Sequence, residues 1–527
     1  MARLQSKPYP PVIFWLGLFS LHLALRWSIL HTTFLDIDEA QFAGFARVLL
    51  DGGLPYRDSL DTKSLGIYLF YAACFKLFPA EPMFGVRIIT LLWTFAQATL
   101  LAAVVRQGMG QSNRATKTGR LAAFFFIIFS TTFIPKYLAT SINSVMTLFL
   151  IGATFFTLKA NAALDKEKIY DALAGFLTGL ALLFKYQAGI QFFIFAIFVS
   201  PLCPFIKNLP GWRRVIKRVM IFGLAMCVPF ALQGFALWQM GVWPDFVRWS
   251  LLGSGAYIIQ GGGSIPFWRS FLAKALPYFL STMLIWILAG KAILSAKKQT
   301  AADASEAFRY GVLWAALTLI PVGLSGRFYG HYFLQFLPAL CLLAALGFDS
   351  LDWTKKPLLK KSLMATLIAL PTILFGILRW DTHRFNASFP DDSLNEQEII
   401  GKRVSLQVTP NEKIFVWGFA TAIYYHAKAS PMSRFLWTDL LVGRVPGARI
   451  TPEQAKAYRN PEAWAAFWKD WQQNPPAVFV DTSPGNIHGY AVFPPKNYLD
   501  LAGELSKNYE LKENVLGAVI YRRKTPF

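Results

Sequence analysis

Apolar runs long enough to cross a lipid bilayer recur along this chain, and they constrain its fold more than any other feature. A helix needs about 20 residues to cross the hydrocarbon core. Such runs lie near 11–30, 84–105, 120–135, 141–158, 171–184, 187–204, 218–240, 272–295, 309–325, 330–349 and 362–379. The pattern predicts an all-α polytopic membrane bundle of about 11 transmembrane helices.

Composition and the placement of charge support a membrane location. Only 16% of the 527 residues are charged, and the mean hydropathy is +0.39. Lys and Arg gather in the loops at 106–119, 159–170, 205–217, 296–308 and 350–361. Because basic loops stay on the cytoplasmic side, we expect a cytoplasmic N-terminus and a tail after Trp380 on the opposite side. The net charge of +22 then reflects orientation, and we expect no nucleic-acid partner.

The composition changes to polar and charged at about residue 381. Lys413–Trp417, Ala477–Val480 and Gly517–Tyr521 have the pattern of strands, whereas Glu462–Gln472 and Leu499–Lys507 have that of helices. We therefore predict two domains. Residues 1–380 form the transmembrane domain, with its first external loop at 31–83, and 381–527 form a soluble extracytoplasmic α/β domain.

The first external loop begins with the acidic run Asp36-Ile37-Asp38-Glu39. Apolar residues then follow at helical spacing, and Gly52-Gly53 ends the pattern; they are Phe42, Phe45, Ala46, Leu49 and Leu50. The spacing predicts an amphipathic helix that holds Asp38 and Glu39 at its N-terminus, at the membrane surface. The apolar stretch 65–78 is predicted to form a second helix along that surface, because a span there would place the basic loop at 106–119 outside.

Carboxylates and a lysine occur together in this loop, because Asp61 and Lys63 follow Asp38 and Glu39. One carboxylate could take the proton of an acceptor hydroxyl, while Lys63 binds the phosphate that leaves a lipid-linked sugar. The alternative for Asp38 is a helix cap, since Asp is a favoured N-cap residue. A cluster of charges beside lipid favours the functional interpretation, because such charges are costly to keep without a use.

Further cations are expected on the same side of the membrane, against the orientation bias. Lys185 lies in the turn between the fifth and sixth runs, and Arg327 and His331 lie between the ninth and tenth. These residues suggest a phosphate or other anion site. For Lys185 the alternative is a lysine whose stem lies along apolar surface while its ammonium reaches water.

Two other classes of function compete with a transferase. A transporter or lipid-linked sugar flippase predicts ionisable residues near mid-span and internal symmetry, whereas the carboxylates here lie in the loop at one face. A non-enzymatic envelope assembly protein acting through its tail would tolerate replacement of Asp38.

The chain resembles the GT-C glycosyltransferases, in particular the protein mannosyltransferases, the lipid A aminoarabinose transferase and bacterial lipopolysaccharide-core sugar transferases. The resemblance is carried by Asp38-Glu39-Ala40, Gly52-Gly53-Leu54-Pro55-Tyr56, Asp61-Thr62-Lys63, Gly326-Arg327-Phe328-Tyr329-Gly330-His331-Tyr332-Phe333-Leu334-Gln335, Val416-Trp417-Gly418, Ser433-Arg434-Phe435 and Val480-Asp481-Thr482-Ser483. It departs from the family pattern at Gln41, where an arginine often follows the acidic pair. Thr62 separates Asp61 from its lysine, and Ser64-Leu65 replaces prolines.

The resemblance implies inverting transfer of a sugar from a polyprenyl-phosphate donor to a hydroxyl of an envelope lipid, glycan or protein. Asp38 would be the base, Glu39 and Asp61 further acidic residues of the catalytic site. Lys63, Arg327, Lys185 and His331 would bind the donor phosphate. Some relatives bind a divalent metal near this loop and others do not, so a metal is possible. The implied location is a bacterial inner membrane, with the first loop and C-terminal domain in the periplasm.

Overall fold

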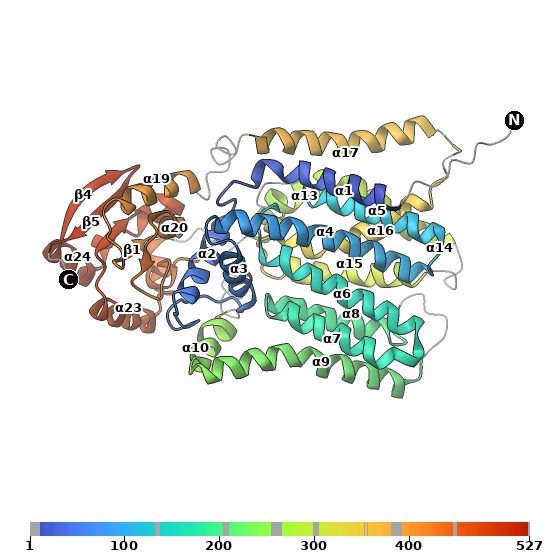
Figure 1. Cartoon of the computed structure of the whole chain (residues 1–527), viewed down its shortest axis with the longest axis horizontal. Helices are drawn as coiled ribbons and strands as arrows, with labels where there is room; N and C mark the ends of the chain where they lie inside the picture. Colours follow the sequence, from blue (N-terminus) through green and yellow to red (C-terminus); the bar gives the residue numbers. More distant parts are fainter. Residues whose placement is uncertain are drawn as a thin grey trace.

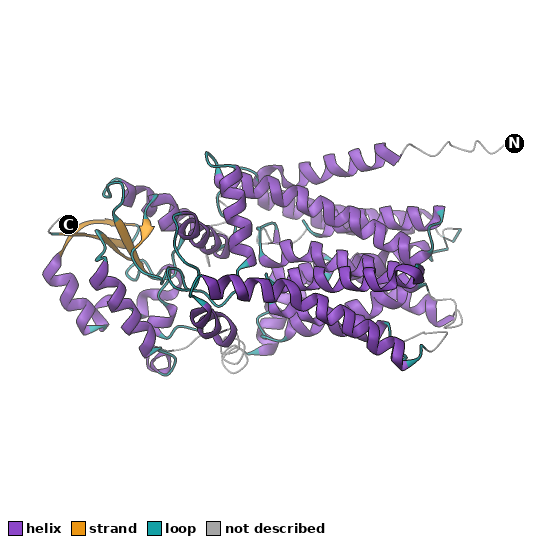
Figure 2. Ribbon diagram, turned by 60° about the horizontal axis from the view of Figure 1, so that its bottom comes forward, coloured by secondary structure: helices purple, strands orange, loops and turns teal. Residues whose placement is uncertain are grey.

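The computed structural model describes residues 11–131, 137–203, 210–253, 266–298, 305–352, 354–355, 357–380, 393–445 and 451–524. Long helices lie side by side, and the strands are confined to one end of the molecule (Figures 1 and 2). The bundle helices are α1 (Pro11–Arg26), α4 (Pro82–Met109), α5 (Asn113–Phe129), α6 (Ile142–Ala162), α7 (Glu167–Leu182), α8 (Ile190–Phe198), α9 (Trp212–Gln239), α14 (Met283–Lys298), α15 (Glu306–Gly323), α16 (Leu337–Asp349) and α17 (Pro357–Trp380). Short helical segments connect them: η1 (Trp27–Ile29), η3 (Leu164–Lys166), η4 (Tyr186–Gly189), α10 (Trp243–Phe246), η5 (Val247–Leu252), α12 (Phe267–Ser270), η6 (Phe271–Ala275), α13 (Leu276–Ser281) and η8 (Gly330–Gln335).

Several of these helices could cross a membrane by length and apolar character. Within the described residues these are Val12–Ile29, Pro82–Met109, Ile142–Ala162 and Trp212–Gln239. The pair Phe267–Ser281 and Met283–Ala296 is a further candidate, bent by 76°. The chain is therefore an integral membrane protein with several apolar spans, and the figure of about 11 stays a prediction.

Close packing of α7 against α9 fixes the direction in which α7 leads into the site. A Cβ on Gly175 would lie 2.1 Å from the carbonyl oxygen of Phe222, and one on Gly179 would lie 2.3 Å from that of Met226. Small residues of this kind let helix backbones approach each other in membranes. The last turn of α7 then delivers Lys185 to the end of the bundle that carries the first loop.

The first loop (31–83) contains the two expected helices, α2 (Ile37–Leu50) and α3 (Gly66–Leu77). Asp36 caps α2, because its side chain accepts a hydrogen bond from the Asp38 N–H. Gly52 follows the helix with φ +88°, a conformation that favours glycine. Phe42, Phe45 and Ala46 are buried as expected, whereas Leu50 at the end of the predicted apolar face is 43% exposed.

The C-terminal region (393–524) contains a mixed five-stranded sheet in the order β2-β1-β3-β5-β4. Its strands are β1 (Lys413–Trp417), β2 (Ser430–Pro431), β3 (Val478–Asp481), β4 (Tyr509–Val515) and β5 (Ala518–Arg523). Strands β2, β1 and β3 are parallel, while β5 is antiparallel to both β3 and β4. Its helical segments are α19 (Leu394–Ser405), α20 (Ala422–Ala427), α21 (Asp439–Val442), α22 (Pro452–Lys456), α23 (Pro461–Gln473), η9 (Ile487–Val492), η10 (Pro495–Asn497) and α24 (Leu499–Asn508). The expected α/β composition is confirmed, and β2 and β4 are additions to the expected strands.

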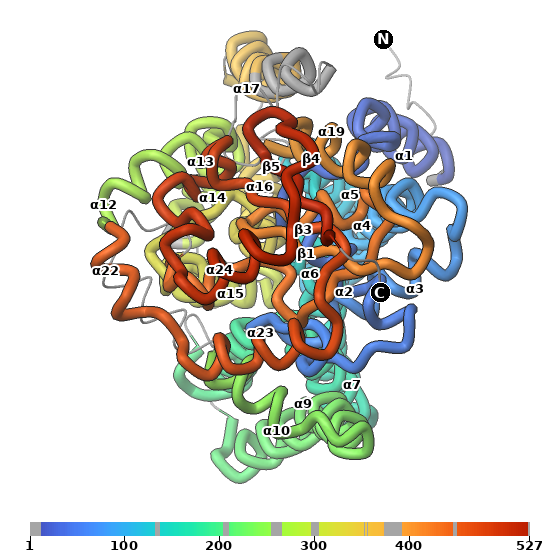
Figure 3. The backbone as a smooth tube through the Cα atoms, turned by 90° about the vertical axis from the view of Figure 1, so that its left-hand side faces the viewer, coloured from blue at the N-terminus to red at the C-terminus, as the bar shows by residue number. Residues whose placement is uncertain are grey.

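One hydrophobic core joins the first loop to this sheet. It includes Phe42 and Tyr68 of the loop helices together with Val416 and Leu436 of the C-terminal region. The view down the bundle shows the sheet lying over the ends of α2, α4 and α6 (Figure 3). Because the two regions share buried side chains, the division at 380/381 stays a prediction.

Candidate active site

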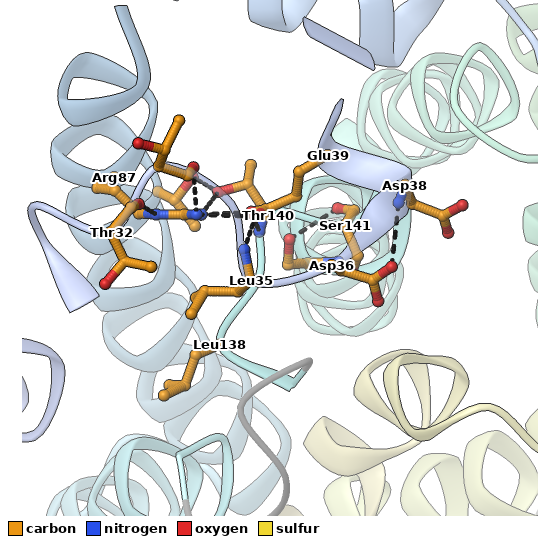
Figure 4. A network of polar contacts seen from close by, with 12 residues as sticks. Thr32, Leu35, Asp36, Asp38, Glu39, Arg87, Leu138, Thr140 and Ser141 are labelled. Carbon is orange, nitrogen blue, oxygen red and sulfur yellow. Dashed lines mark hydrogen bonds and ion pairs between the residues drawn. The ribbon is translucent and has the colours of Figure 1, made fainter. Parts of the chain in front are cut away.

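Asp38 and Glu39 lie in the first turn of α2, where the helix dipole favours negative charge. Consecutive residues of a helix point in different directions. Figure 4 shows the Asp38 carboxylate directed away from the polar network that surrounds Glu39. The two adjacent carboxylates therefore have different surroundings.

Glu39 is fully buried and completely engaged (Figure 4). Both of its oxygens bind the Arg87 guanidinium of α4, one of them at 2.7 Å. The backbone N–H groups of Leu35 and Thr140 also donate to it, at 2.8 and 2.6 Å. Breaking a buried pair of this kind typically costs about 3–5 kcal/mol. The geometry gives Glu39 a positioning role, because it ties the start of α2 to α4 and to the segment before α6.

Asp61 is also buried, and it organises Lys63. Its Oδ2 accepts hydrogen bonds from Lys63 Nζ at 3.0 Å and from the Tyr68 hydroxyl at 2.5 Å. Burial first, and then the charge of Asp61, raise the pKa of Tyr68 well above its ordinary value, so this hydroxyl remains a donor. Gln41, at the position where the family often has arginine, accepts a further hydrogen bond from Lys63 at 3.2 Å.

Lys63 remains partly accessible, with 25% of its side chain exposed. Its Nζ lies 5.4 Å from the ring centre of Phe42 and 6.0 Å from that of Trp437. Trp437 belongs to the C-terminal region, 374 positions further along the chain. Sequence reasoning missed this contact, since nothing in the local sequence of either segment indicates it.

Lys185 lies just beyond α7, half-buried, near both Asp38 and Lys63. Its Nζ donates to Asn143 Oδ1 at 3.3 Å and lies 3.9 Å from the ring centre of Tyr332. Burial lowers the pKa of Lys185 to about 7, an effect that Asp38 opposes and Lys63 reinforces. The expected grouping of Lys185 with the first-loop charges is therefore present in the structure.

The segment containing Arg327 and His331 reaches the same group through Tyr332. His331 is half-buried and packs on Tyr329 and Tyr332, with ring centres 6.0 and 4.9 Å apart. Arg327 is fully buried in the connection between α15 and η8. Within the described contacts, Lys185 and Tyr332 provide the direct link between this segment and the first-loop charges.

Asp38 differs from the other acidic residues in being available. Within the described part of the chain, no hydrogen bond or ion pair engages its carboxylate, whereas Glu39 and Asp61 are both fully occupied. The described residues contain no group of three or more His, Cys, Asp or Glu side chains placed to hold a metal ion. The site thus combines one available carboxylate with two lysines at the end of the bundle.

A model of the family described as dolichyl-phosphate-mannose-protein mannosyltransferase matches residues 62–238, which include Lys63 and Lys185. This part of the chain is therefore similar to a family of glycosyltransferases. The match favours an enzyme that takes its sugar from a lipid-phosphate carrier over the transporter alternative. A comparison with curated proteins finds no match.

Solved structures share the fold of this chain. ArnT from Cupriavidus metallidurans, bound to undecaprenyl phosphate, is similar with a TM-score of 0.57 and 14% identity over 97% of each chain. The archaeal oligosaccharyltransferase AglB from Archaeoglobus fulgidus, in complex with an inhibitory peptide and a dolichol-phosphate, has a TM-score of 0.54 and 12% identity. That match covers 98% of this chain and 75% of AglB. At these identities the likeness shows the fold alone.

Proposed function

We propose that this protein is a glycosyltransferase that moves a sugar from a polyprenyl-phosphate donor to a hydroxyl of a cell-envelope acceptor, with inversion at the anomeric carbon. The acceptor would be lipid A or lipopolysaccharide, another glycan, or a protein. The observation that carries the proposal is the available Asp38 carboxylate near Lys185, which in turn lies near Lys63, while Glu39 and Asp61 are occupied. The reaction would take place on the extracytoplasmic face of a bacterial inner membrane.

In the proposed reaction, Asp38 accepts the proton of the acceptor hydroxyl as its oxygen bonds to the anomeric carbon. The bond between that carbon and the phosphate oxygen breaks, and polyprenyl phosphate leaves with the electron pair. Lys63 and Lys185 stabilise the negative charge of the leaving phosphate, and Arg327 and His331 contribute to the same site. Asp61 holds Lys63 in position, and Glu39 holds the helix that carries Asp38.

The relatives of the same fold support the donor class. ArnT was solved with undecaprenyl phosphate and AglB with a dolichol-phosphate, both of which are polyprenyl phosphates without their sugar. Each has the form that the leaving group would take here.

The test is sugar transfer by the purified protein in liposomes, from a panel of radiolabelled polyprenyl-phosphate sugars to an envelope-lipid extract. We expect Asp38→Asn to lower the transfer rate by about 10²–10⁴-fold, the usual contribution of a general base. Asp51→Asn is the matched control, because Asp51 lies at the other end of α2 and its partner Arg47 is exposed. Transfer that survives in Asp38→Asn would contradict the assigned base.

A further inference from the structure

Three loops of the C-terminal region follow the three parallel strands, and each supplies one ring to the same edge of the sheet. Phe419 follows β1, Trp437 follows β2, and His488 follows β3. The motifs Val416-Trp417-Gly418, Ser433-Arg434-Phe435 and Val480-Asp481-Thr482-Ser483 lie at these strand ends as well. The carboxyl edge of parallel strands is where open α/β sheets bind their ligands.

The three rings form a continuous row in the spatial order of their strands, β2-β1-β3. The ring centres of Trp437 and Phe419 are 6.0 Å apart, and those of Phe419 and His488 are 5.3 Å apart. All three side chains are half-buried, so part of each remains open. We call Trp437, Phe419 and His488 the aromatic row.

The surrounding backbone and charges hold the row in place. Gly418 has φ +141°, and a Cβ there would lie 2.0 Å from the Thr482 hydroxyl oxygen, so only glycine lets the β1 and β3 loops approach this closely. The Arg444 guanidinium lies 5.5 Å from the ring centre of Phe419 and is itself held by Asp439. This support fixes the middle ring of the row.

One end of the row meets the proposed donor-phosphate site. Trp437 packs on Phe45 of α2 and lies beside Lys63. Three other indoles of this region donate their N–H groups to protein oxygens, namely Trp417 to Phe493, Trp464 to Leu441 and Trp471 to Glu504. Within the described residues, the N–H groups of Trp437 and Trp468 donate to no protein oxygen, and of these two only Trp437 lies beside Lys63. Trp437 therefore offers both an aromatic face and an available hydrogen-bond donor next to Lys63.

We propose that the aromatic row is the subsite that binds the acceptor as a glycan, by stacking on its sugar rings; this rests on the proposed function. A sugar ring presents an apolar face of C–H groups and a rim of hydroxyls, which matches half-open aromatic faces with a polar donor beside them. The row begins at Lys63, where the donor phosphate is expected, and extends away from it over the C-terminal region. Its length suits an oligosaccharide acceptor rather than the single sugar of the donor.

The test measures transfer by the full-length protein in liposomes as a function of acceptor concentration, with envelope-lipid extract as the acceptor. We expect Trp437→Ala and Phe419→Ala each to raise the acceptor KM about tenfold, the loss expected for one stacked ring. The donor KM should stay within about twofold of wild type, and Trp437→Phe should restore most of the acceptor affinity. An equal rise in the donor KM would assign the row to the donor sugar and overturn the proposal, as would an unchanged acceptor KM.

Two controls separate this proposal from folding and from the proposed function. Trp468→Ala removes another half-exposed indole, one that packs on Phe467 and Trp471 of its own helix, and should leave the acceptor KM unchanged. Oligosaccharides released from the same extract should bind Asp38→Asn protein and lose that binding when Trp437→Ala is added. If wild type transfers no sugar, the proposed function fails, but the binding measurement still decides the role of the row; absence of binding to Asp38→Asn would overturn it.

Discussion

The two ends of α7 both carry ionisable side chains, and they use them differently. Near its start, both oxygens of Asp171 bind Arg218 of α9 at 2.8 Å, and Arg218 also reaches Asn161 of α6 at 2.7 Å. Beyond its last turn, Lys185 has an amide oxygen and an aromatic face as neighbours. No carboxylate in the described part of the chain lies within ion-pairing distance of it.

The difference separates charges that hold helices together from charges kept for a ligand. A buried ion pair whose hydrogen bonds are all made within the protein has no hydrogen-bonding capacity left for a substrate. The function of this pair is to hold α6, α7 and α9 together. A half-buried lysine with incomplete partners keeps binding capacity for an anion. The same contrast separates Glu39 from Asp38 within a single helical turn.

The largest expected effect is on stability, at the start of α7, where Asp171 and Arg218 are paired. Asp171→Asn leaves the buried Arg218 with the more distant Glu167, at 3.6 Å, as its remaining carboxylate partner, and should lower the free energy of unfolding by up to about 3–5 kcal/mol. Thermal unfolding in detergent would measure this, with Asp165→Asn on exposed η3 as the control. If Asp171→Asn changed the donor KM strongly but left stability unchanged, the ion pair at the start of α7 would not be a structural one.

The next largest effect should be on donor binding, just beyond the end of α7, where Lys185 lies. Lys185→Met removes a cation from the expected phosphate site, and we expect the donor KM to rise by about 10–100-fold, the usual worth of a hydrogen bond to a charged group. Thermal unfolding should change little, because methionine fills a similar volume and needs no desolvation of charge. Loss of folded protein would instead show that Lys185 is structural.

The smallest effect is in the pH dependence. With the pKa of Lys185 lowered to about 7, the free enzyme loses this cation as pH rises through 7, so kcat/KM for the donor should fall about tenfold between pH 6.5 and 8.5. Lys185→Arg should flatten that fall, because a guanidinium stays protonated.

Stability should follow the opposite trend. Between the folded pKa of about 7 and the ordinary value of 10.5, the unfolded chain binds more protons, so the free energy of unfolding of wild type should rise with pH relative to Lys185→Met. If kcat/KM for the donor has the same pH profile in wild type, Lys185→Arg and Lys185→Met, Lys185 does not belong to the donor site.

Local patterns in the sequence predicted local structure well. The apolar spacing and Gly52-Gly53 defined α2, and the short apolar run Ile-Phe-Val-Trp after Lys413 defined β1 within its observed bounds. Apart from the family resemblance, the sequence could not separate Asp38 from Glu39, because adjacent carboxylates look alike until Arg87, 48 positions from Glu39, is packed against one of them. The contact between Lys63 and Trp437 was equally inaccessible, since it depends on how the sheet packs on the first loop.

The core shared by the first loop and the sheet has a consequence for biosynthesis. The ribosome makes α2 early, yet Leu436, which lies against Gly44 of that helix, and the sheet behind it are made near the end. Until that final part emerges, α3 packs on the apolar residues Phe42 and Phe45 of α2, but the surface of α2 beside Gly44 has no cover from Leu436, and Lys63 has no neighbouring indole. A chain cut short after α17 would therefore insert its spans but expose this surface of α2 to chaperones and proteases. Only the full-length protein would both resist degradation and have a complete site around Lys63.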